Sequence, residues 1–343
     1  MNEITAALHQ LASGAELSRG AAREVMDAVM RGDCPDAAFG ALFAMLHARG
    51  ETIDELAGFA ESMRAHVVAV AAPAGAIDTC GTGGDGAGTF NVSAAAALVA
   101  AGAGAVVAKH GNRAVSSSCG SADVLEALGG RLETDPDGVP AMLDAAGFAF
   151  LFAPVFHPSM RHAAGPRRAL GMRTAFNYLG PITNPAHVSR QVVGVSDIDA
   201  ARKLAQVLQQ LGTERALVVH GGDGIDELSL GAPSTMFDVT PESVVVTVVD
   251  AEQLGLARAP VSAIAGGDAE RNAGLLRSVL DGSAAGPLRD VVLLNAGAAL
   301  VVADRAADIA EGIDLARSSI STGNAEARLR AWIAASDVGM VTT

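Results

Sequence analysis

The spacing of apolar residues along the chain predicts a helical start followed by alternating strands and helices. In the first part of the chain apolar side chains recur three and four positions apart, as across residues 39–46, and this is the period of an amphipathic helix. Gly50 is placed to end that helix, and residues 52–55 form a capping-box sequence that begins the next one. These patterns predict a helical domain over residues 1–72.

Beyond residue 72 the pattern changes to short, continuous apolar runs separated by helical stretches. The runs lie at residues 105–108, 148–152, 192–195, 216–220 and 244–249. Runs of this kind are typical of strands that are buried on both faces of a parallel sheet. The longest apolar run, residues 291–303, is too short to span a bilayer, and it predicts a buried helix. We therefore predict an α/β protein with a small N-terminal all-helical domain and a large α/β domain over residues 73–343, built on a mainly parallel central sheet.

Residues 153–185 interrupt this alternation, because they contain prolines and arginines and have no strand period. We expect helices and loops here, and we expect the helices from about residue 159 to 185 to join the N-terminal helical domain. The segment contains four arginines, Arg161, Arg167, Arg168 and Arg173. Such a group suits contact with a carboxylate or a phosphate, and a solvated basic helix face explains it equally well.

A glycine-rich loop follows the first strand of the predicted sheet. The apolar lead-in ends at Ile77, glycines occupy positions 81, 83, 84, 86 and 88, and an alanine-rich helix runs from Ser93 to about Gly102. Glycines let backbone N–H groups approach a ligand closely, and a helix N-terminus adds unpaired donors and a positive dipole end. The natural ligand of such a loop is a phosphate, and the alternative is an ordinary turn between a strand and a helix.

Two further polar loops follow later strands. The run at 105–108 leads into Lys109, His110, Gly111, Asn112 and Arg113, and then into three serines at 116–118. The run at 216–220 leads into a glycine loop with the paired carboxylates Asp226 and Glu227. Ligands bind at the carboxyl ends of strands in open α/β sheets, and paired carboxylates there suit Mg²⁺ bound together with phosphates. The alternative for this last loop is a common Asp-Gly turn.

Composition and charge narrow the classes of function. The chain has 343 residues, 50% of them hydrophobic and 3% aromatic, so its size favours two domains and its core favours closely packed helices. A formal net charge of −14 argues against general nucleic-acid binding and against attraction to anionic membranes. Three cysteines without metal-type spacing fit reduced thiols, and the N-terminus lacks the features of a signal peptide. We expect a cytoplasmic protein.

Eight motifs carry a resemblance to a known family. They are GETIDELAGFAESMR at 50–64, DTCGTGGDG at 78–86, TFNVS at 89–93, KHGNRAVSS at 109–117, GSADVLEALG at 120–129, FLFAPVFHPSM at 150–160, RTAFNYLGPITNPA at 173–186 and VVHGGDGIDELSL at 218–230. In this order and spacing the chain resembles, over nearly its whole length, the anthranilate phosphoribosyltransferases, which share the fold of the class III nucleoside phosphorylases.

This resemblance implies a reaction, a metal and an assembly. The reaction is transfer of the 5-phosphoribosyl group from phosphoribosyl pyrophosphate to the amino group of anthranilate, with release of pyrophosphate, in tryptophan biosynthesis. The metal is Mg²⁺, with two ions per subunit. The assembly is a homodimer formed through the helical domain, which suits the extra apolar faces of its helices.

The resemblance also implies the residues of the site. Those for phosphoribosyl pyrophosphate are Gly81, Gly84, Asp85, Thr89, Asn91, Val92, Ser93, Ala94, Lys109, His110, Gly111, Asn112, Arg113, Ala114, Val115, Ser116, Ser117 and Ser121. Those for anthranilate are Gly81, Asn112 and Arg167, and those for magnesium are Ser93, Asp226 and Glu227. Two departures affect the phosphate contacts: Ala94 stands where the family commonly has threonine, and Ser118 with Cys119 stands where lysine and serine are frequent.

The role of His110 stays open at the level of sequence. It is a candidate general base, but the aniline-type nitrogen of anthranilate is neutral at pH 7 and needs no prior deprotonation. The histidine can equally donate a hydrogen bond that shapes its loop. Two other functions are compatible with the fold: a nucleoside phosphorylase, which would not need Asp226 and Glu227, and a nucleic-acid-binding relative, which would be basic with degraded loops.

Overall fold

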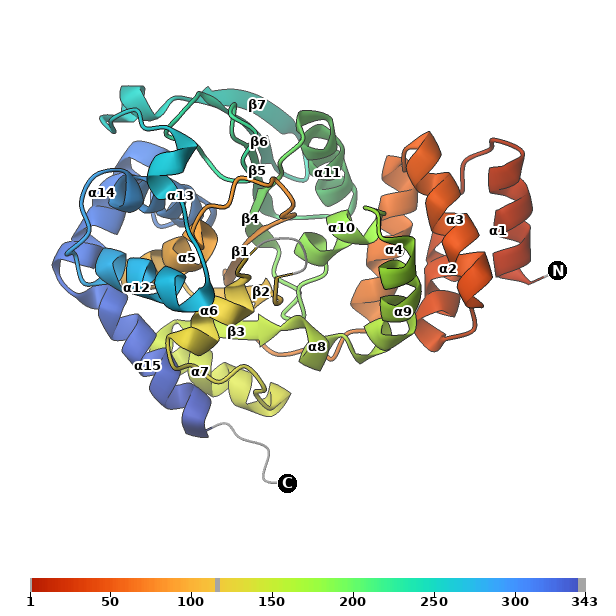
Figure 1. Ribbon diagram of the computed structural model, residues 1–343, viewed down its shortest axis with the longest axis horizontal. Helices are drawn as coiled ribbons and strands as arrows, with labels where there is room; N and C mark the ends of the chain where they lie inside the picture. Colours follow the sequence, from red (N-terminus) through yellow and green to blue (C-terminus); the bar gives the residue numbers. More distant parts are fainter. Residues whose placement is uncertain (1, 115–117, 339–343) are drawn as a thin grey trace.

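The computed structural model describes residues 2–114 and 118–338. Four helices form the N-terminal part (Figure 1): α1 Glu3–Ala12, α2 Arg19–Arg31, α3 Asp36–Arg49 and α4 Ile53–Ala65. Their ends follow the local sequence, since Ser18 caps α2 through the N–H of Ala21, and Thr52 and Glu55 form the predicted capping box of α4. Gly50, which we expect to end α3, is its C-cap.

Two helices from the middle of the chain pack against this N-terminal part. They are α9 Arg161–Leu170 and α10 Phe176–Leu179, and they lie beside α2, α3 and α4 (Figure 1). Phe176 is buried against Phe43, with ring centroids 4.9 Å apart, and Ala163 belongs to the same apolar cluster. We call these six helices the helical part; the exact division of the chain into domains at residue 72 stays a prediction.

A seven-stranded sheet forms the centre of the large part, in the order β3-β2-β1-β4-β5-β6-β7. The strands are β1 Ile77–Gly81, β2 Val107–Gly111, β3 Phe148–Phe152, β4 Arg190–Gly194, β5 Arg215–His220, β6 Ser234–Val239 and β7 Val244–Val249. Strands β3, β2, β1, β4 and β5 are parallel, and β6 and β7 are added antiparallel at one edge. The predicted α/β class with a mainly parallel sheet is confirmed.

The two faces of this sheet are covered by different helices. Along β5, Leu217 and Val219 belong to one apolar cluster and Ala216 and Val218 to another, because successive side chains of a strand point to opposite faces. The first cluster includes residues of α5 Val92–Gly102, α6 Ser121–Ala127, α7 Val139–Ala146, α12 Ala269–Leu280, α13 Pro287–Val302, α14 Ile309–Ser321 and α15 Asn324–Val338. The second cluster joins α11 Ile198–Gln210 to the helical part. The helical part is therefore attached to one face of the sheet through α11 and α4.

Shorter helical turns complete the connections. They are η1 Pro136–Gly138, α8 Ala153–Phe156, η2 Pro158–Met160, η3 Gly180–Ile182, η4 Ala251–Leu254 and η5 Val261–Ile264. The buried helix expected at residues 291–303 is α13, so that prediction is confirmed. Of the helices within residues 2–114 and 118–338, none combines the length and the apolar character needed to cross a membrane.

The second polar loop begins later than the sequence predicts. Strand β2 continues to Gly111, so Lys109 and His110 lie in the strand instead of the loop, paired in register with Phe150 and Leu151 of β3. The apolar pattern stops at residue 108, but the backbone ladder continues because both polar side chains find partners inside the protein. Strand β6 was also outside the predictions, because its polar and apolar residues form no continuous apolar run.

The start of α6 differs from prediction by one residue. Its N-cap is Gly120, whereas the residue type alone predicts the cap at the neighbouring Ser121, which is the first helical residue. The Ser121 hydroxyl lies where a Cβ on Gly111 would stand. Gly111 and Ser121 are therefore adjacent, and the glycine leaves room for the serine.

Candidate active site

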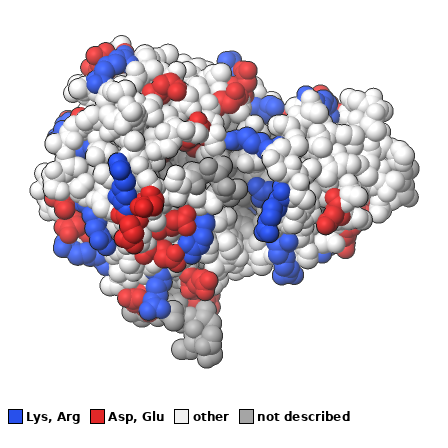
Figure 2. Space-filling view, viewed as in Figure 1, with Lys and Arg blue, Asp and Glu red and all other residues white. Residues whose placement is uncertain are grey.

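The three polar loops of the sequence meet at one edge of the sheet. They follow β1, β2 and β5, and the parallel strands of an open sheet present their carboxyl ends at the same edge. Figure 2 shows a hollow between the large part and the helical part, bordered by Lys and Arg atoms on the side of the helices. The candidate active site therefore lies between the loops and the helical part.

The first loop is held at Gly83 between two oppositely charged side chains. The Gly83 N–H donates to Asp226 Oδ2 at 2.7 Å, and the Gly83 carbonyl accepts from Arg173 Nη1 at 3.2 Å. Gly84 has a φ of 75°, a backbone conformation that residues other than glycine rarely adopt. A Cβ at this position would also displace the Arg173 guanidinium. A Cβ on Gly81 would collide with the Asp226 carboxylate. The positive φ therefore requires glycine at position 84, and glycine at position 81, the last residue of β1, leaves room for the Asp226 carboxylate.

The far end of the first loop is anchored to later segments of the chain. Thr89 forms an isolated β-bridge with Ala265. The Asn91 side chain accepts from Asn272 Nδ2 at 2.9 Å and donates to the Cys119 carbonyl at 3.2 Å. Cys119 makes this contact through its backbone, so its departure from the family pattern leaves the tie between the two loops intact.

The predicted binding residues Val92, Ser93 and Ala94 in the first turn of α5 differ in burial. The side chains of Val92 and Ala94 are buried, and the Val92 N–H donates to the Phe90 carbonyl at 2.7 Å. Ser93 is half-buried, and its hydroxyl accepts from Lys109 Nζ at 3.2 Å. Of the predicted residues at 92–94, Ser93 is the one whose side chain reaches the site.

Lys109 is a buried cation held by oxygen acceptors. Its residue is 1% exposed, and its ammonium group donates to the Thr79 carbonyl as well as to Ser93. Burial raises the pKa of the Glu227 carboxyl well above its usual value, and the positive charge of Lys109 opposes that rise. Lys109 therefore connects the start of α5 with the carboxylate loop.

Asp78 is a buried carboxylate that sequence reasoning did not assign to the site. It lies in β1 and accepts from the His110 N–H at 3.1 Å and from Asn184 Nδ2 at 2.7 Å. Burial raises its pKa to about 6, against the effect of the Lys109 charge. A lone carboxylate at the start of a glycine motif, directly after an apolar residue, is the signal that could have identified it.

The carboxylates of Asp85, Asp226 and Glu227 lie close together. Burial raises the pKa of Asp226, with the negative charge of Asp85 as the next cause, and burial followed by the charge of Asp226 raises that of Glu227. A divalent cation would relieve this repulsion. Mg²⁺ is usually bound by one or two carboxylates plus phosphates and water, and no three His, Cys, Asp or Glu side chains form a ready metal site within residues 2–114 and 118–338. The residues fit Mg²⁺ that arrives together with a diphosphate.

His110 is buried and held by a backbone acceptor. Its Nδ1 lies 3.2 Å from the Gly180 carbonyl and therefore carries the proton, whereas its Nε2 is buried without a partner among the described residues. Burial and the neighbouring His157 ring, whose centroid is 4.9 Å away, lower the pKa of His110 to about 3. So weak a base, turned toward Gly180, is better suited to shaping the second loop than to accepting a proton.

Of the second loop beyond Gly111, the structure describes residues 112–114 and then residues from 118 onward. Asn112 is exposed, and its Oδ1 accepts from the Arg113 N–H at 2.7 Å. The Arg113 guanidinium pairs with Asp123 and Glu126 of α6, at 3.0 and 2.7 Å, and the Ala114 N–H also donates to Asp123. Arg113 is therefore occupied by carboxylates in this structure. The predicted residues Val115, Ser116 and Ser117 lie outside the described residues.

Arg167 contrasts with Arg113, because no carboxylate in the described part of the chain pairs with it. It is half-buried on α9, and its guanidinium carbon lies 4.9 Å from the centroid of the Phe176 ring. Burial lowers its pKa. Its neighbour Arg168 is exposed. A guanidinium that is partly removed from water and stacked on a ring is suited to bind a planar carboxylate.

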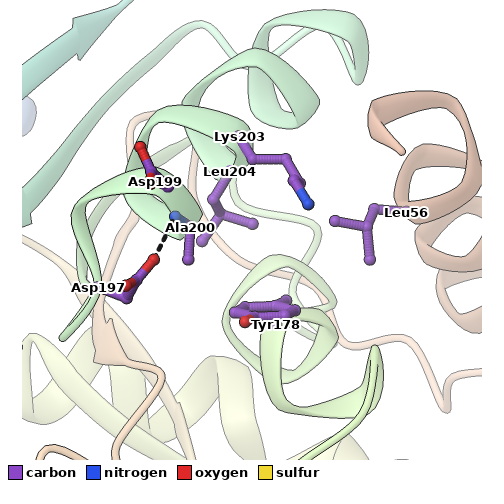
Figure 3. A pocket seen from close by; sticks show the side chains of 7 residues that line it. All are labelled: Leu56, Tyr178, Asp197, Asp199, Ala200, Lys203 and Leu204. Carbon is purple, nitrogen blue, oxygen red and sulfur yellow. Dashed lines mark hydrogen bonds between the residues drawn. The ribbon is translucent and has the colours of Figure 1, made fainter. Parts of the chain in front are cut away.

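A small cavity of about 120 Å³ lies apart from these loops, between α4, α10 and α11 (Figure 3). Its lining residues are Leu56, Tyr178, Asp197, Asp199, Ala200, Lys203 and Leu204. Asp197 caps α11 through the Ala200 N–H at 2.8 Å, and Lys203 donates to the Glu51 carbonyl at 2.6 Å. Because Asp197 and Lys203 already have partners, we assign the cavity to the packing between the helical part and α11.

Family models match both parts of the chain. The model described as Glycosyl transferase family, helical bundle domain, matches residues 5–67, and the model described as Glycosyl transferase family, a/b domain, matches residues 74–326. The fold and the loops at its strand ends therefore define a glycosyltransferase with a helical bundle in front of an α/β domain.

Individual relatives narrow this class. The chain is 49% identical over 339 residues to the anthranilate phosphoribosyltransferase of Herpetosiphon aurantiacus, covering 98% of this chain and 99% of that protein. It is 51% identical over 334 residues to the enzyme of the same name from a Roseiflexus species, covering 96% and 97%. The chain belongs to the anthranilate phosphoribosyltransferases, and it is an enzyme of tryptophan biosynthesis.

Solved structures agree with this family. The anthranilate phosphoribosyltransferase of Thermus thermophilus superposes with a TM-score of 0.91 at 43% identity, covering 96% of this chain and 99% of that one. The enzyme from Saccharomyces cerevisiae, solved in complex with PRPP and Mg, superposes with a TM-score of 0.90 at 27% identity, covering 98% of both chains. The resemblance carried by the eight sequence motifs is confirmed.

Proposed function

We propose that this chain transfers the 5-phosphoribosyl group from phosphoribosyl pyrophosphate (PRPP) to the amino group of anthranilate, giving N-(5-phosphoribosyl)anthranilate and pyrophosphate, with the site residues named below. The observation that carries this proposal is the 2.7 Å hydrogen bond from the Gly83 N–H to Asp226 Oδ2. It joins a glycine loop suited to phosphate directly to the carboxylate pair suited to Mg²⁺, so one diphosphate can contact both.

The diphosphate and ribose are assigned to the first two loops and the start of α5. The contributing residues are Gly81, Gly84, Asp85, Thr89, Asn91, Ser93, Lys109, residues 110–117 and Ser121, with Val92 and Ala94 limited to their backbones. Breaking the bond between ribose C1 and pyrophosphate builds positive charge on the sugar and negative charge on the leaving group. Donors aimed at the diphosphate stabilise that charge more in the transition state than in the ground state.

Mg²⁺ is assigned to Ser93, Asp226 and Glu227. When bound it supplies positive charge that neutralises the leaving pyrophosphate. The close carboxylates of Asp226 and Glu227, whose pKa values burial raises, support this assignment, and their proximity to Asp85 supports two ions per subunit. A yeast relative has been solved in complex with PRPP and Mg.

Anthranilate is assigned to Gly81, Asn112 and Arg167. The Arg167 guanidinium holds the carboxylate by paired, charge-assisted hydrogen bonds and thereby orients the neutral amine toward ribose C1. His110 donates its Nδ1–H to the Gly180 carbonyl at 3.2 Å and thereby positions the second loop. No general base is assigned, because the amine attacks in its neutral form.

The assembly is proposed to be a cytoplasmic homodimer formed through the helical part. Leu8, Ala38 and Met45 are only partly buried there, and they can contribute apolar contact area to a second subunit. The net charge of −14 gives no basis for a nucleic-acid or membrane partner. Sedimentation equilibrium on the full chain distinguishes dimer from monomer.

Incubation with PRPP, Mg²⁺ and anthranilate tests the proposed activity, with loss of anthranilate fluorescence as the signal. Fluorescence should fall only when all three are present, and pyrophosphate should appear in equal amount. Phosphorolysis of thymidine in a parallel assay, without loss of anthranilate fluorescence in the first, would favour the nucleoside phosphorylase alternative and overturn the proposal.

A further inference from the structure

We infer that Arg173 is a positioning residue that couples the helical part to the diphosphate loop by holding Gly83 and Gly84. This inference rests on the proposed function, because it concerns how the loop that receives PRPP is kept in place. Arg173 is outside the set of residues that the motifs assign to either substrate or to the metal.

The backbone around Arg173 is fixed independently of the loop. Gly171 ends α9 in the left-handed conformation with φ of 60°, so the chain turns sharply two residues before Arg173. Directly after it, the Thr174 N–H donates to Asn177 Oδ1 at 2.9 Å, and Thr174 is buried. Arg173 therefore extends from a short connector that is held at both ends by α9 and α10.

The Arg173 side chain contacts the loop at Gly83 and Gly84. Its Nη1 donates to the Gly83 carbonyl at 3.2 Å, and the guanidinium occupies the space that a Cβ on Gly84 would need. On its other side, the same Gly83 donates to Asp226 Oδ2 at 2.7 Å. The peptide units around Gly83 are thus held from the helical part by a cation and from the β5 to β6 connection by an anion.

This arrangement restricts a loop that is rich in glycine. Gly83, Gly84, Gly86 and Gly88 all have positive φ, and glycines have the largest conformational freedom to lose on ordering. Two opposed hydrogen bonds at Gly83 restrict that freedom before PRPP binds, and a loop that is already ordered binds its ligand more tightly. Loss of Arg173 should therefore weaken PRPP binding and leave the anthranilate side unaffected.

The first test compares Arg173→Ala with Arg168→Ala, a matched arginine on the same segment that is exposed on α9. Arg173→Ala should raise both the Kd for PRPP, measured by calorimetry with Mg²⁺, and the KM for PRPP by roughly tenfold, as expected for loss of one charge-assisted hydrogen bond. Its KM for anthranilate should stay within about twofold. Arg168→Ala should stay within about twofold for both substrates.

The second test is a double-mutant cycle between Arg173→Ala and Gly84→Ala. In the wild-type background the new Cβ on Gly84 collides with the guanidinium and also suffers the strain of positive φ. In the Arg173→Ala background only the strain remains. Gly84→Ala should therefore raise the Kd for PRPP by a factor about fivefold or more smaller in the Arg173→Ala background than in the wild type. Such non-additivity is expected of residues in contact.

Arg173→Lys separates positioning from charge. Lysine keeps the charge but not the planar fork, so it should recover only a small part of the loss. Full recovery would mean that charge alone matters and would overturn the positioning role. Additive effects in the double-mutant cycle would also overturn the positioning role. The same holds if Arg173→Ala behaves like Arg168→Ala while the wild-type enzyme turns over normally. Absence of PRPP binding by the wild type would instead overturn the proposed function and this inference together.

Discussion

Replacing Arg167 by alanine should raise the KM for anthranilate and leave PRPP binding nearly unchanged. The guanidinium is half-buried, lies 4.9 Å from the Phe176 ring centroid, and has no carboxylate partner within residues 2–114 and 118–338. It is therefore available for an anionic ligand, and its planar fork matches a carboxylate through two parallel hydrogen bonds. The chain has a net charge of −14, which repels the anionic anthranilate, and the positive charge of Arg167 opposes that repulsion locally.

The size of the expected loss in kcat/KM follows from the partial burial of the Arg167 guanidinium. A hydrogen bond to a charged group contributes about 1.5–3 kcal/mol, so a paired contact offers about 3–6 kcal/mol before solvent screening. Because the side chain is only half-buried, screening reduces this value. We expect a loss in kcat/KM of about 2–4 kcal/mol, which corresponds to roughly 30- to 900-fold.

The same substitution should leave the fold nearly as stable as before. Arg167→Ala removes a ring contact of about 0.5–1 kcal/mol with Phe176, but it also removes a partly desolvated charge that has no counter-ion in the described structure. The free energy of unfolding, from urea denaturation, should therefore change by less than about 1 kcal/mol. A large loss of activity with little loss of stability identifies a binding residue.

The assay is steady-state kinetics with anthranilate varied at saturating PRPP, and then with PRPP varied at saturating anthranilate. Arg168→Ala is the control, because Arg168 is the exposed neighbour and points about 100° away around the helix. It should be nearly neutral. Equal effects of the two substitutions, or a loss confined to PRPP, would refute the reasoning and would mean that the basic segment handles phosphate or is only a solvated face.

Three further predictions follow from the site. Asp226→Asn combined with Glu227→Gln should abolish turnover while the cooperative urea transition is kept, since both substitutions preserve side-chain size and an amide oxygen can still accept from the Gly83 N–H; full turnover in a Mg²⁺ titration would contradict the metal assignment. Gly84→Val should destroy PRPP binding, because a β-branched side chain at φ of 75° is strained and collides with Arg173; unchanged affinity by calorimetry would exclude the phosphate-loop role. Burial lowers the pKa of His157 to about 4, so the folded protein binds a proton at this side chain more weakly than the unfolded chain does. The free energy of unfolding is therefore unaffected by this group above a pH of about 6.5 and decreases as pH falls toward 4. His157→Gln should therefore reduce the fall in unfolding free energy between pH 7 and 4.5 by about 2 kcal/mol, and an unchanged pH dependence in urea denaturation would assign the effect to another group.

Features with a local physical cause were predictable from the sequence. The continuous apolar runs at 148–152 and 244–249 are β3 and β7 with the predicted limits, and the Thr52 capping box starts α4 as expected. The three polar loops could be placed at one edge of the sheet because they follow parallel strands. The predicted end of a strand was wrong where the backbone hydrogen-bond ladder continues beyond the apolar residues, as at Lys109 in β2.

Only the tertiary structure decided which of the charged residues are free to act. Arg113 and Arg167 are both candidate binding residues, yet Asp123 and Glu126 pair with Arg113, and Arg167 lies over Phe176 without a carboxylate partner in the described part of the chain. By itself the sequence determined the family, the order of the elements and the residue types at the strand ends, because helix period, strand period and turn chemistry act over a few neighbouring positions. The ionisation and availability of a side chain depend on burial and on neighbours brought together by packing, as when Gly83 meets Asp226 across 143 positions of the chain.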